Sequence, residues 1–234
     1  MRRVSYKLSI MSRAVVLLSG GLDSATAAAI AKEEGHELFA LTIDYGQRHQ
    51  IEIESAKKIA ENIGVEKHII MPVDLRLFGG SSLTSETEVP KDIPFEQIGQ
   101  NIPNTYVPAR NTVFLALALA YAESVGAEKI YIGISSVDYS GYPDCRPEFL
   151  QAFNTLAHLA TKADTEKAPF QIEAPLISLT KRETIQRGLQ LGVDYSLTLT
   201  CYDPSPEGKS CRRCESCQLR QNAFRELGIP DPAL

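Results

Sequence analysis

The chain has no long hydrophobic run, no excess of positive charge and no repeated or low-complexity segment. Its longest uncharged apolar stretches, such as Thr112–Tyr121, are too short to cross a bilayer. With 24 basic and 29 acidic residues, the net charge is −5, which argues against a protein whose main partner is a polynucleotide. No apolar signal-peptide core follows Met1-Arg2-Arg3. We therefore expect a cytoplasmic protein with no membrane partner and no direct nucleic-acid partner.

Two common nucleotide-binding signatures are also missing: the Gly-Lys-Ser/Thr of the Walker A loop and the G-x-G-x-x-G of dinucleotide folds. Instead, Ser19–Ser24 reads Ser-Gly-Gly-Leu-Asp-Ser, between the apolar run Ala14–Leu18 and the alanine-rich run Ala25–Lys32. This order predicts a strand, a loop and a helix. The unpaired N–H groups and the dipole of a helix start attract phosphate, and paired glycines permit its close approach. A glycine pair alone is more often a simple turn, but these flanks favour a phosphate-binding loop.

The helix dipole alone is too weak to hold a triphosphate. It stabilises an anion by about 0.3–1 kcal/mol, and by about 2 at most. We therefore expect a magnesium ion and a basic side chain, such as Lys181 or Arg110, to assist the loop.

Apolar runs alternate with helical patterns along most of the chain. Predicted strands cover 14–18, 37–43, 67–73, 129–134 and 170–174, and predicted helices cover 52–63, 112–125, 148–163 and 180–191. Thr180 is a plausible N-cap for the last helix, with Glu183 at position N3. Such alternation predicts an α/β fold in which a doubly wound, mostly parallel sheet lies between two layers of helices.

Two stretches break the alternation and indicate the domain organisation. Residues 74–111 are rich in Gly, Ser, Thr and Pro, and irregular loops of this length in compact domains are usually functional or disordered. The second stretch, toward the C-terminus, holds four of the five cysteines. We expect an N-terminal extension at 1–13 (Met11 is an alternative start), an ATP-binding α/β domain at 14–195 that includes the long loop, and a cysteine-rich segment at 196–234 packed on it.

The C-terminal cysteines, Cys201, Cys211, Cys214 and Cys217, form the pattern C-x9-C-x2-C-x2-C. Because no export signal is present, we expect reduced thiols, and disulfides are the weaker interpretation. Four thiolates in so short a segment suit a closed, tetrahedral, structural zinc site. An iron–sulfur cluster is the serious alternative, since C-x2-C-x2-C also occurs in ferredoxins, although their C-x3-C-P continuation is missing.

Polar segments are expected to meet where ligands bind in open parallel sheets, at the carboxyl ends of the strands. They are residues 19–24, 44–49, 110–111 and 135–146. The last is too polar for a core and is either a surface loop or a pocket for a second substrate. Within it, Asp138, Asp144 and Arg146 have the chemistry to bind a heteroaromatic ring that carries an acid group. Cys145 lies beside them, but no histidine is placed to activate it as a nucleophile.

Together these motifs resemble a known family. The Ser-Gly-Gly-x-Asp-Ser loop resembles the pyrophosphate loop of the N-type ATP pyrophosphatase superfamily, whose fold is adenine nucleotide alpha hydrolase-like. The fuller set resembles the 7-cyano-7-deazaguanine synthase family from about Ala14 to the end of the chain. That set comprises residues 19–24, 44–49, 106–111, 138–146 and 173–176, Lys181, the four cysteines and the terminal Gly-Ile-Pro-Asp-Pro.

The resemblance implies an ATP-dependent C–N ligase of queuosine biosynthesis. Such an enzyme converts 7-carboxy-7-deazaguanine and ammonia to the nitrile 7-cyano-7-deazaguanine, using ATP and Mg²⁺, with one structural Zn²⁺ per chain. The long loop would shield the activated acid from water. An ATP-dependent tRNA thiolase with an iron–sulfur cluster is the main alternative, although the net charge of −5 counts against it. A zinc-dependent interaction module would leave the polar loops unused, and a homodimer is left open.

The resemblance also distributes roles among the residues. Catalytic roles fall on Asp23, Asp138 and Lys181. Substrate contacts fall on Arg110, Asn111, Asp138, Tyr139, Asp144 and Arg146. ATP contacts fall on Leu17, Leu18, Ser19, Gly20, Gly21, Leu22, Asp23, Ser24, Ala25, Thr26 and Ala27. None of these residues needs to act as a covalent nucleophile.

Overall fold

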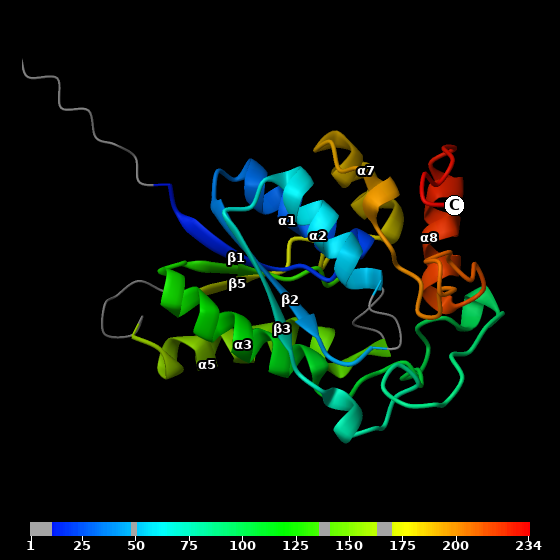
Figure 1. The fold of residues 1–234 in the computed structure, drawn as a ribbon, viewed down its shortest axis with the longest axis horizontal. Helices are drawn as coiled ribbons and strands as arrows, with labels where there is room; N and C mark the ends of the chain where they lie inside the picture. Colours follow the sequence, from blue (N-terminus) through cyan, green and yellow to red (C-terminus); the bar gives the residue numbers. More distant parts are fainter. Residues whose placement is uncertain (1–10, 48–50, 136–140, 163–169) are drawn as a thin grey trace, which may run out of the picture.

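A five-stranded, fully parallel sheet forms the centre of the computed structural model, which describes residues 11–47, 51–135, 141–162 and 170–234 (Figure 1). The strand order is β3-β2-β1-β4-β5. The strands are β1 (Arg13–Leu17), β2 (Glu37–Asp44), β3 (Lys67–Pro72), β4 (Lys129–Tyr131) and β5 (Gln171–Glu173). Because β1 pairs with both β2 and β4, the chain reverses its direction of winding at β1, and ligands bind at such a switch point.

Helices cover both faces of the sheet, as the alternation predicts (Figure 1). One layer holds α1 (Leu22–Glu33) and α2 (Ile51–Ile63), and the other holds α3 (Arg110–Val125) and α5 (Pro147–Ala160). Side chains of a strand point alternately to its two faces. Accordingly, Val15 of β1 packs in the cluster of α3 and α5, whereas Val16 packs in the cluster of α1 and α2. This two-sided burial explains why β1 and β2 are apolar along nearly their whole length.

The alanine-rich helix α1 is buried on several sides. Its alanines at 25, 28 and 31 lie on the sheet, while Leu22 packs with Ile185, Tyr195 and Phe224 on the opposite side. Those partners belong to α7 (Lys181–Gln190), to the turn before the cysteines and to α8 (Glu215–Glu226). Small side chains let α1 fit between the sheet and this outer layer.

The predicted elements are confirmed, with shifted ends. The strands predicted at 129–134 and 170–174 are shorter, as β4 and β5. Helix α3 begins at Arg110 rather than at 112. It follows Ala109, whose left-handed backbone (φ of 53°) turns the chain from the loop into the helix. Thr180 and Glu183 form the expected capping box at the start of α7. Helix α8 was not predicted, and the expected domain limits at 13/14 and 195/196 stay predictions.

The long loop predicted at 74–111 ends at Ala109, since Arg110 and Asn111 belong to α3. Up to there it is irregular, as expected, apart from the short 3-10 turns η1 (Leu75–Leu77) and η2 (Phe95–Gln97). It is nevertheless packed, because its apolar side chains Leu83, Val89 and Val107 join the core next to α3. Its middle also contacts the cysteine-rich segment: Lys91 forms a β-bridge with Cys214, and Asp92 pairs with Arg213 through backbone and side chain. The middle of the loop is therefore held against the cysteine-rich segment by these contacts.

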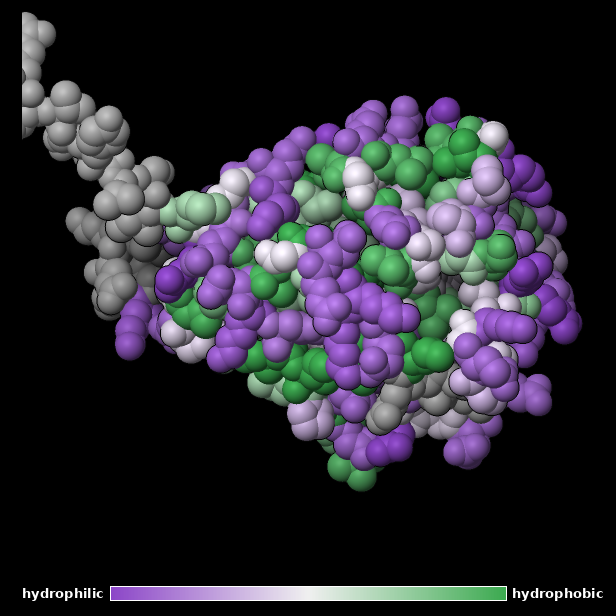
Figure 2. Space-filling model, turned by 45° about the horizontal axis from the view of Figure 1, so that its top comes forward, coloured by the Kyte–Doolittle hydropathy of each residue, from purple (hydrophilic) through white to green (hydrophobic). Residues whose placement is uncertain are grey.

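Within the described residues, no helix is long and apolar enough to cross a membrane. The view in Figure 2 shows a mostly hydrophilic face on which hydrophobic atoms form small, separate patches.

A buried ion pair ties the C-terminal tail to α8. The Arg220 guanidinium donates to the Asp231 carboxylate at 2.7 and 2.8 Å, to Thr198 Oγ1 at 2.7 Å and to the Tyr195 carbonyl oxygen at 3.1 Å. Both charged side chains are nearly inaccessible, with exposed fractions of 6% and 4%. The pair therefore joins the tail, α8 and the segment before the cysteines.

We expect Asp231→Ala to lower the free energy of unfolding by about 3–5 kcal/mol, because it leaves the buried Arg220 cation without its counter-charge. Urea unfolding monitored by circular dichroism measures this change. Glu54→Ala is the matched control: it breaks the exposed pair with Lys57 on α2 and should cost less than about 0.5 kcal/mol. Equal effects of the two substitutions would contradict a special role for the buried pair.

Candidate functional site

The loop that we predict to bind phosphate lies between the end of β1 and the start of α1, as the strand-loop-helix pattern predicts. Ser24 Oγ accepts hydrogen bonds from the Ser19 N–H at 3.2 Å and from Ser19 Oγ at 3.0 Å, and donates to the Gly21 carbonyl oxygen at 3.0 Å. Gly21 is the N-cap of α1 and has no side chain with which to cap the first N–H groups. The first turn of α1 therefore has no side-chain cap, and its residues Gly21, Asp23 and Ser24 line the pocket, where an anion would be held.

Two glycines permit this loop to approach its neighbours. Gly20 has a φ of 86°, and a Cβ atom on it would lie 2.3 Å from the carbonyl oxygen of Glu52 in α2. Gly133, which follows β4, would place a Cβ atom 2.7 Å from the backbone nitrogen of Ser24. Backbone atoms cannot move aside as side chains do. Glycine at both positions thus brings α2 and β4 against the start of α1.

The predicted catalytic residues Asp23 and Lys181 are brought together from positions far apart in the chain. The Lys181 ammonium donates to Asp23 Oδ2 at 2.6 Å and to Ser135 Oγ at 3.4 Å. Their side chains have exposed fractions of only 11% and 18%. Asp23 lies in the first turn of α1 and Lys181 in the first turn of α7, so the pair lies beside the phosphate loop.

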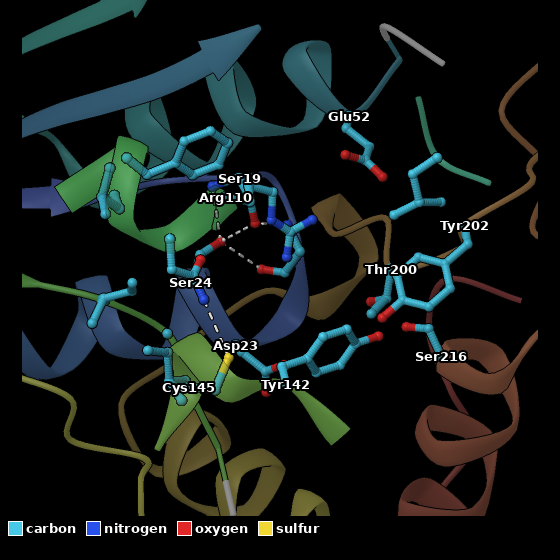
Figure 3. A pocket seen from close by; sticks show the side chains of 18 of the residues that line it. Ser19, Asp23, Ser24, Glu52, Arg110, Tyr142, Cys145, Thr200, Tyr202 and Ser216 are labelled. Atoms are coloured by element: carbon cyan, nitrogen blue, oxygen red, sulfur yellow. Dashed lines mark hydrogen bonds between the residues drawn. The ribbon is translucent and has the colours of Figure 1, made fainter. Parts of the chain in front are cut away.

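A single pocket extends from this loop across the carboxyl ends of β1, β2 and β4 (Figure 3). Arg110, the first residue of α3, lies in its middle, with its guanidinium carbon 5.6 Å from the centre of the Tyr45 ring and 5.9 Å from that of Phe114. Burial raises the pKa of Tyr45 to about 12, so this tyrosine stays neutral at physiological pH. The aromatic rings thus hold one fixed positive charge in the pocket.

Hydrogen bonds connect the start of α3 to the turn η3 (Pro143–Cys145), through Asn111, Asp144 and Cys145. The Asn111 N–H donates to Asp144 Oδ2 at 2.9 Å, while Asn111 Nδ2 donates to the Asp144 carbonyl oxygen and to Cys145 Sγ, each at 3.1 Å. Asp144 is buried against the helix start and does not line the pocket, whereas Asn111 and Cys145 do.

The other predicted substrate residues are placed less favourably or not described. Arg146 is exposed at the N-cap of α5, outside the pocket lining. Asp138 and Tyr139 fall outside the described residues. For Asp144, Arg146, Asp138 and Tyr139, the role in substrate binding stays a prediction.

The sequence alone missed several residues that line the pocket. Glu52 enters it from the first turn of α2 (Figure 3). Burial raises the pKa of its carboxyl group to about 8, although the positive charge of Arg110 acts in the opposite direction. The only sequence signal was its position at the start of a predicted helix that follows a polar strand end.

The cysteine-rich segment supplies the remaining wall of the pocket. The wall residues flank the cysteines in sequence: Leu199, Thr200 and Tyr202 around Cys201, and Glu215, Ser216 and Leu219 around Cys214 and Cys217. The Leu199 N–H also donates to the Gly20 carbonyl oxygen at 3.0 Å, which links this segment to the phosphate loop. This proximity was visible only after the chain had folded.

The four cysteines fit a tetrahedral metal site. Their sulfur atoms lie within 4.8 Å of one another, and none of the cysteines is in a disulfide. Backbone N–H groups point at the sulfurs: those of Cys211 and Asp203 donate to Cys201 Sγ at 3.2 and 3.4 Å, and that of Cys214 donates to Cys211 Sγ at 3.3 Å. Such donors stabilise thiolates. The cluster therefore favours a metal over disulfides, as predicted.

Comparisons with known proteins find a matching family and relatives that share more than half of their residues with this chain. The protein family described as "Queuosine biosynthesis protein QueC" matches residues 13–228. The 7-cyano-7-deazaguanine synthase of Desulfatibacillum aliphaticivorans is 57% identical over 221 residues, which are 94% of this chain and 95% of that protein. The enzyme of the same name from Paramagnetospirillum magneticum is 57% identical over 223 residues, or 95% and 98% of the two chains. The solved structure of NMN synthetase from Francisella tularensis is similar in fold alone, with 16% identity, a TM-score of 0.51 and coverage of 94% of this chain and 79% of that one.

We expect Gly133→Ala to weaken MgATP binding by at least about tenfold, because the new methyl group would push the backbone at the start of α1 away from β4. Isothermal titration calorimetry measures the affinity. Gly35→Ala serves as the control for loss of a glycine: it has a φ of 85°, with nothing within 4 Å of the added methyl group, so it should lower stability but keep the affinity. Wild-type affinity in Gly133→Ala would show that this close contact does not shape the nucleotide site.

Proposed function

The chain belongs to the QueC family of queuosine biosynthesis proteins, and from this premise we propose that it has the activity named for its relatives, 7-cyano-7-deazaguanine synthase. One observation supports this proposal above all: the phosphate loop, the Asp23–Lys181 pair and the Arg110 cation line a single pocket. ATP and a small acid would therefore lie side by side.

The steps of the reaction follow from the chemistry of its substrate, a carboxylate, and of its product, a nitrile. A carboxylate is a poor electrophile, so ATP first activates the acid of 7-carboxy-7-deazaguanine as a phosphoryl or adenylyl ester. Ammonia then displaces the activated oxygen and forms an amide. A second activation of the amide oxygen permits its loss, which leaves the nitrile. The protein orients the reactants and stabilises the charge that develops on phosphate.

We assign the phosphates to the open N–H groups of α1 and to Ser19 and Ser24. Asp23 would hold a Mg²⁺ ion, whose charge neutralises the phosphates, while the Lys181 ammonium orients the Asp23 carboxylate and lies within reach of an anionic ligand. The remaining predicted contacts, 17–18, 20–22 and 25–27, surround the same helix start, and of these Leu17, Leu18 and Gly21 line the pocket.

We assign the acid substrate to the chamber around Arg110. Tyr45, Tyr142 and Tyr202 line it, and they offer aromatic faces to a flat bicyclic ring, while Arg110 suits the substrate's carboxylate. Asn111 and Asp144 would position Arg110, because their hydrogen bonds secure the first turn of α3.

The cysteine cluster is assigned to one structural zinc per chain. Zinc is bound by four cysteine sulfurs in closed sites and supplies no redox chemistry there. Bound zinc would position the wall residues that flank the four cysteines.

The alternative activity, that of a tRNA thiolase, is not favoured, because the matched family acts in queuosine biosynthesis and the net charge is −5. Small-molecule substrates require neither nucleic acid nor a membrane. Cytoplasmic localisation and a homodimer stay predictions.

We expect the protein to convert 7-carboxy-7-deazaguanine, ammonium and MgATP to 7-cyano-7-deazaguanine, observed by mass spectrometry. Asp23→Ala should lower kcat/KM at least about 100-fold, because it removes the magnesium ligand beside the transferring phosphate. Arg187→Ala is the matched control. Arg187 lies on α7, as Lys181 does, but its exposed ion pair is with Glu33 of α1, so its removal should leave kcat/KM unchanged. Absence of an ATP-dependent nitrile with the wild-type protein would refute the assignment.

Elemental analysis of the purified protein should find one zinc per chain, and its absorption spectrum should show no band in the visible range. Cys214→Ser should lose the metal and lower the thermal unfolding midpoint, since structural zinc binding contributes about 10–16 kcal/mol in small zinc-binding peptides. Cys145→Ser, outside the cluster, should keep the metal. Iron with visible absorption bands, or normal folding of metal-free Cys214→Ser, would overturn the zinc assignment.

A further inference from the structure

We propose that Glu52 is a catalytic base that removes protons from the nitrogen during nitrile formation. This inference rests on the proposed function and adds a residue to which no role in the reaction has been assigned.

Glu52 lies between the two halves of the pocket. Its backbone carbonyl oxygen contacts the phosphate loop so closely that a Cβ atom on Gly20 would lie 2.3 Å away. Its side chain points into the pocket, on the side where Thr200 and Tyr202 lie (Figure 3). The backbone of Glu52 is thus fixed beside the phosphate loop, and its carboxylate faces the chamber of Arg110, where an acid and its activating phosphate would meet.

The Glu52 carboxylate has no structural task in the described part of the chain. It forms no hydrogen bond there and no ion pair within 4 Å, and Arg110 acts on it only through its charge. Asp23, the other carboxylate beside the phosphate loop, is bonded to Lys181 at 2.6 Å. A half-buried carboxylate that faces a pocket and has no bonded partner among the described residues costs stability, so we attribute its presence to function.

The charged and titratable groups that face this pocket come from every element around it. Among the described residues they are Arg110 of α3, Tyr45 after β2, Tyr142 before η3, Cys145 of η3, Tyr202 and Glu215 of the cysteine-rich segment, Asp23 of α1 and Lys181 of α7. Burial is the main cause that raises the pKa of Glu52 to about 8, and Arg110 opposes it. A carboxylate with so high a pKa is a stronger base than an exposed one.

Nitrile formation requires such a base more than once. The nitrogen enters as ammonium with four protons and leaves as a nitrile with none. Attack of ammonia forms the C–N bond, the activated oxygen departs with its phosphate group, and the nitrogen must release a proton. In the second stage the amide oxygen departs with another phosphate group, and the last N–H protons leave as the C≡N bond forms. Glu52 accepts protons from the nitrogen and passes them to solvent.

The first test compares steady-state rates of the full-length protein with 7-carboxy-7-deazaguanine, ammonium and MgATP. Glu52→Gln keeps the size of the side chain but is not a base, so kcat for the nitrile should fall by about 10²- to 10⁴-fold. The KM for the acid should stay within about threefold. Glu61→Gln, an exposed position on α2 without a described partner, should behave as the wild type.

A second nucleophile separates activation from proton removal. Hydroxylamine is neutral at the assay pH and traps the activated acid as a hydroxamate with little need for a base. Glu52→Gln should therefore form hydroxamate at a rate within about threefold of the wild type while failing to form the nitrile. Equal losses in both assays, or a raised KM for the acid with unchanged kcat, would overturn the proposal and indicate a role in binding.

The pH dependence gives an independent readout. The wild-type kcat/KM should rise with pH through a value near 8, as Glu52 loses its proton, and Glu52→Gln should lack this limb. Glu52→Asp should retain the limb at a lower rate. Loss of the limb in Glu215→Gln instead would transfer the role to that residue and overturn the proposal.

Unfolding of the variant can be told apart from loss of the base. Because the pKa of Glu52 is raised in the folded state, the free energy of unfolding falls as the pH rises from about 4.5 to 8. Glutamine carries no charge at either pH, so Glu52→Gln should melt no lower than the wild type at pH 8. If the wild-type protein forms no nitrile, the proposed function fails. If it does and Glu52→Gln matches it, only the role of Glu52 fails.

Discussion

The close approach of three backbone segments at the phosphate loop is the constraint on which the rest of the site depends. Gly20 lets the loop touch α2, and Gly133 lets the extension of β4 touch the first turn of α1. Because these contacts join backbone to backbone, no rotamer change can relieve a larger side chain. The same contacts bring Glu52, the loop and the end of β4 to one pocket. The proposed nucleotide site and the proposed acid chamber therefore depend on the same steric condition.

The cysteine cluster extends this arrangement to the far side of the pocket. Leu199 is hydrogen-bonded to Gly20, and the residues around the cysteines form the opposite wall. The long loop is tied to the same cluster, since Lys91 pairs with both Cys214 and Asp203. A metal in the cluster would therefore organise two segments that have little regular structure of their own, without touching the reactants.

Two carboxylates in one pocket have different environments, and the roles that we propose for them follow from this difference. Asp23 is hydrogen-bonded to the Lys181 ammonium at 2.6 Å beside the phosphate loop, and we propose that it binds a cation there. Glu52 is half-buried in the pocket without a bonded partner in the described residues, and its raised pKa suits it to exchange protons. Enzymes commonly divide such tasks between acidic groups through their surroundings.

The sequence by itself determined the features that depend on neighbours along the chain. The alternation of strands and helices, the capping box at Thr180, the phosphate loop and the cysteine spacing all follow from local patterns, and the structure confirms them as structural elements. Only the tertiary structure decided which residues meet across the chain. It turned Asp144 toward the start of α3 and brought Glu52 and the wall beside the cysteines into the pocket. The physical reason is that burial and charge environment arise from packing between segments distant in sequence, which no local pattern records.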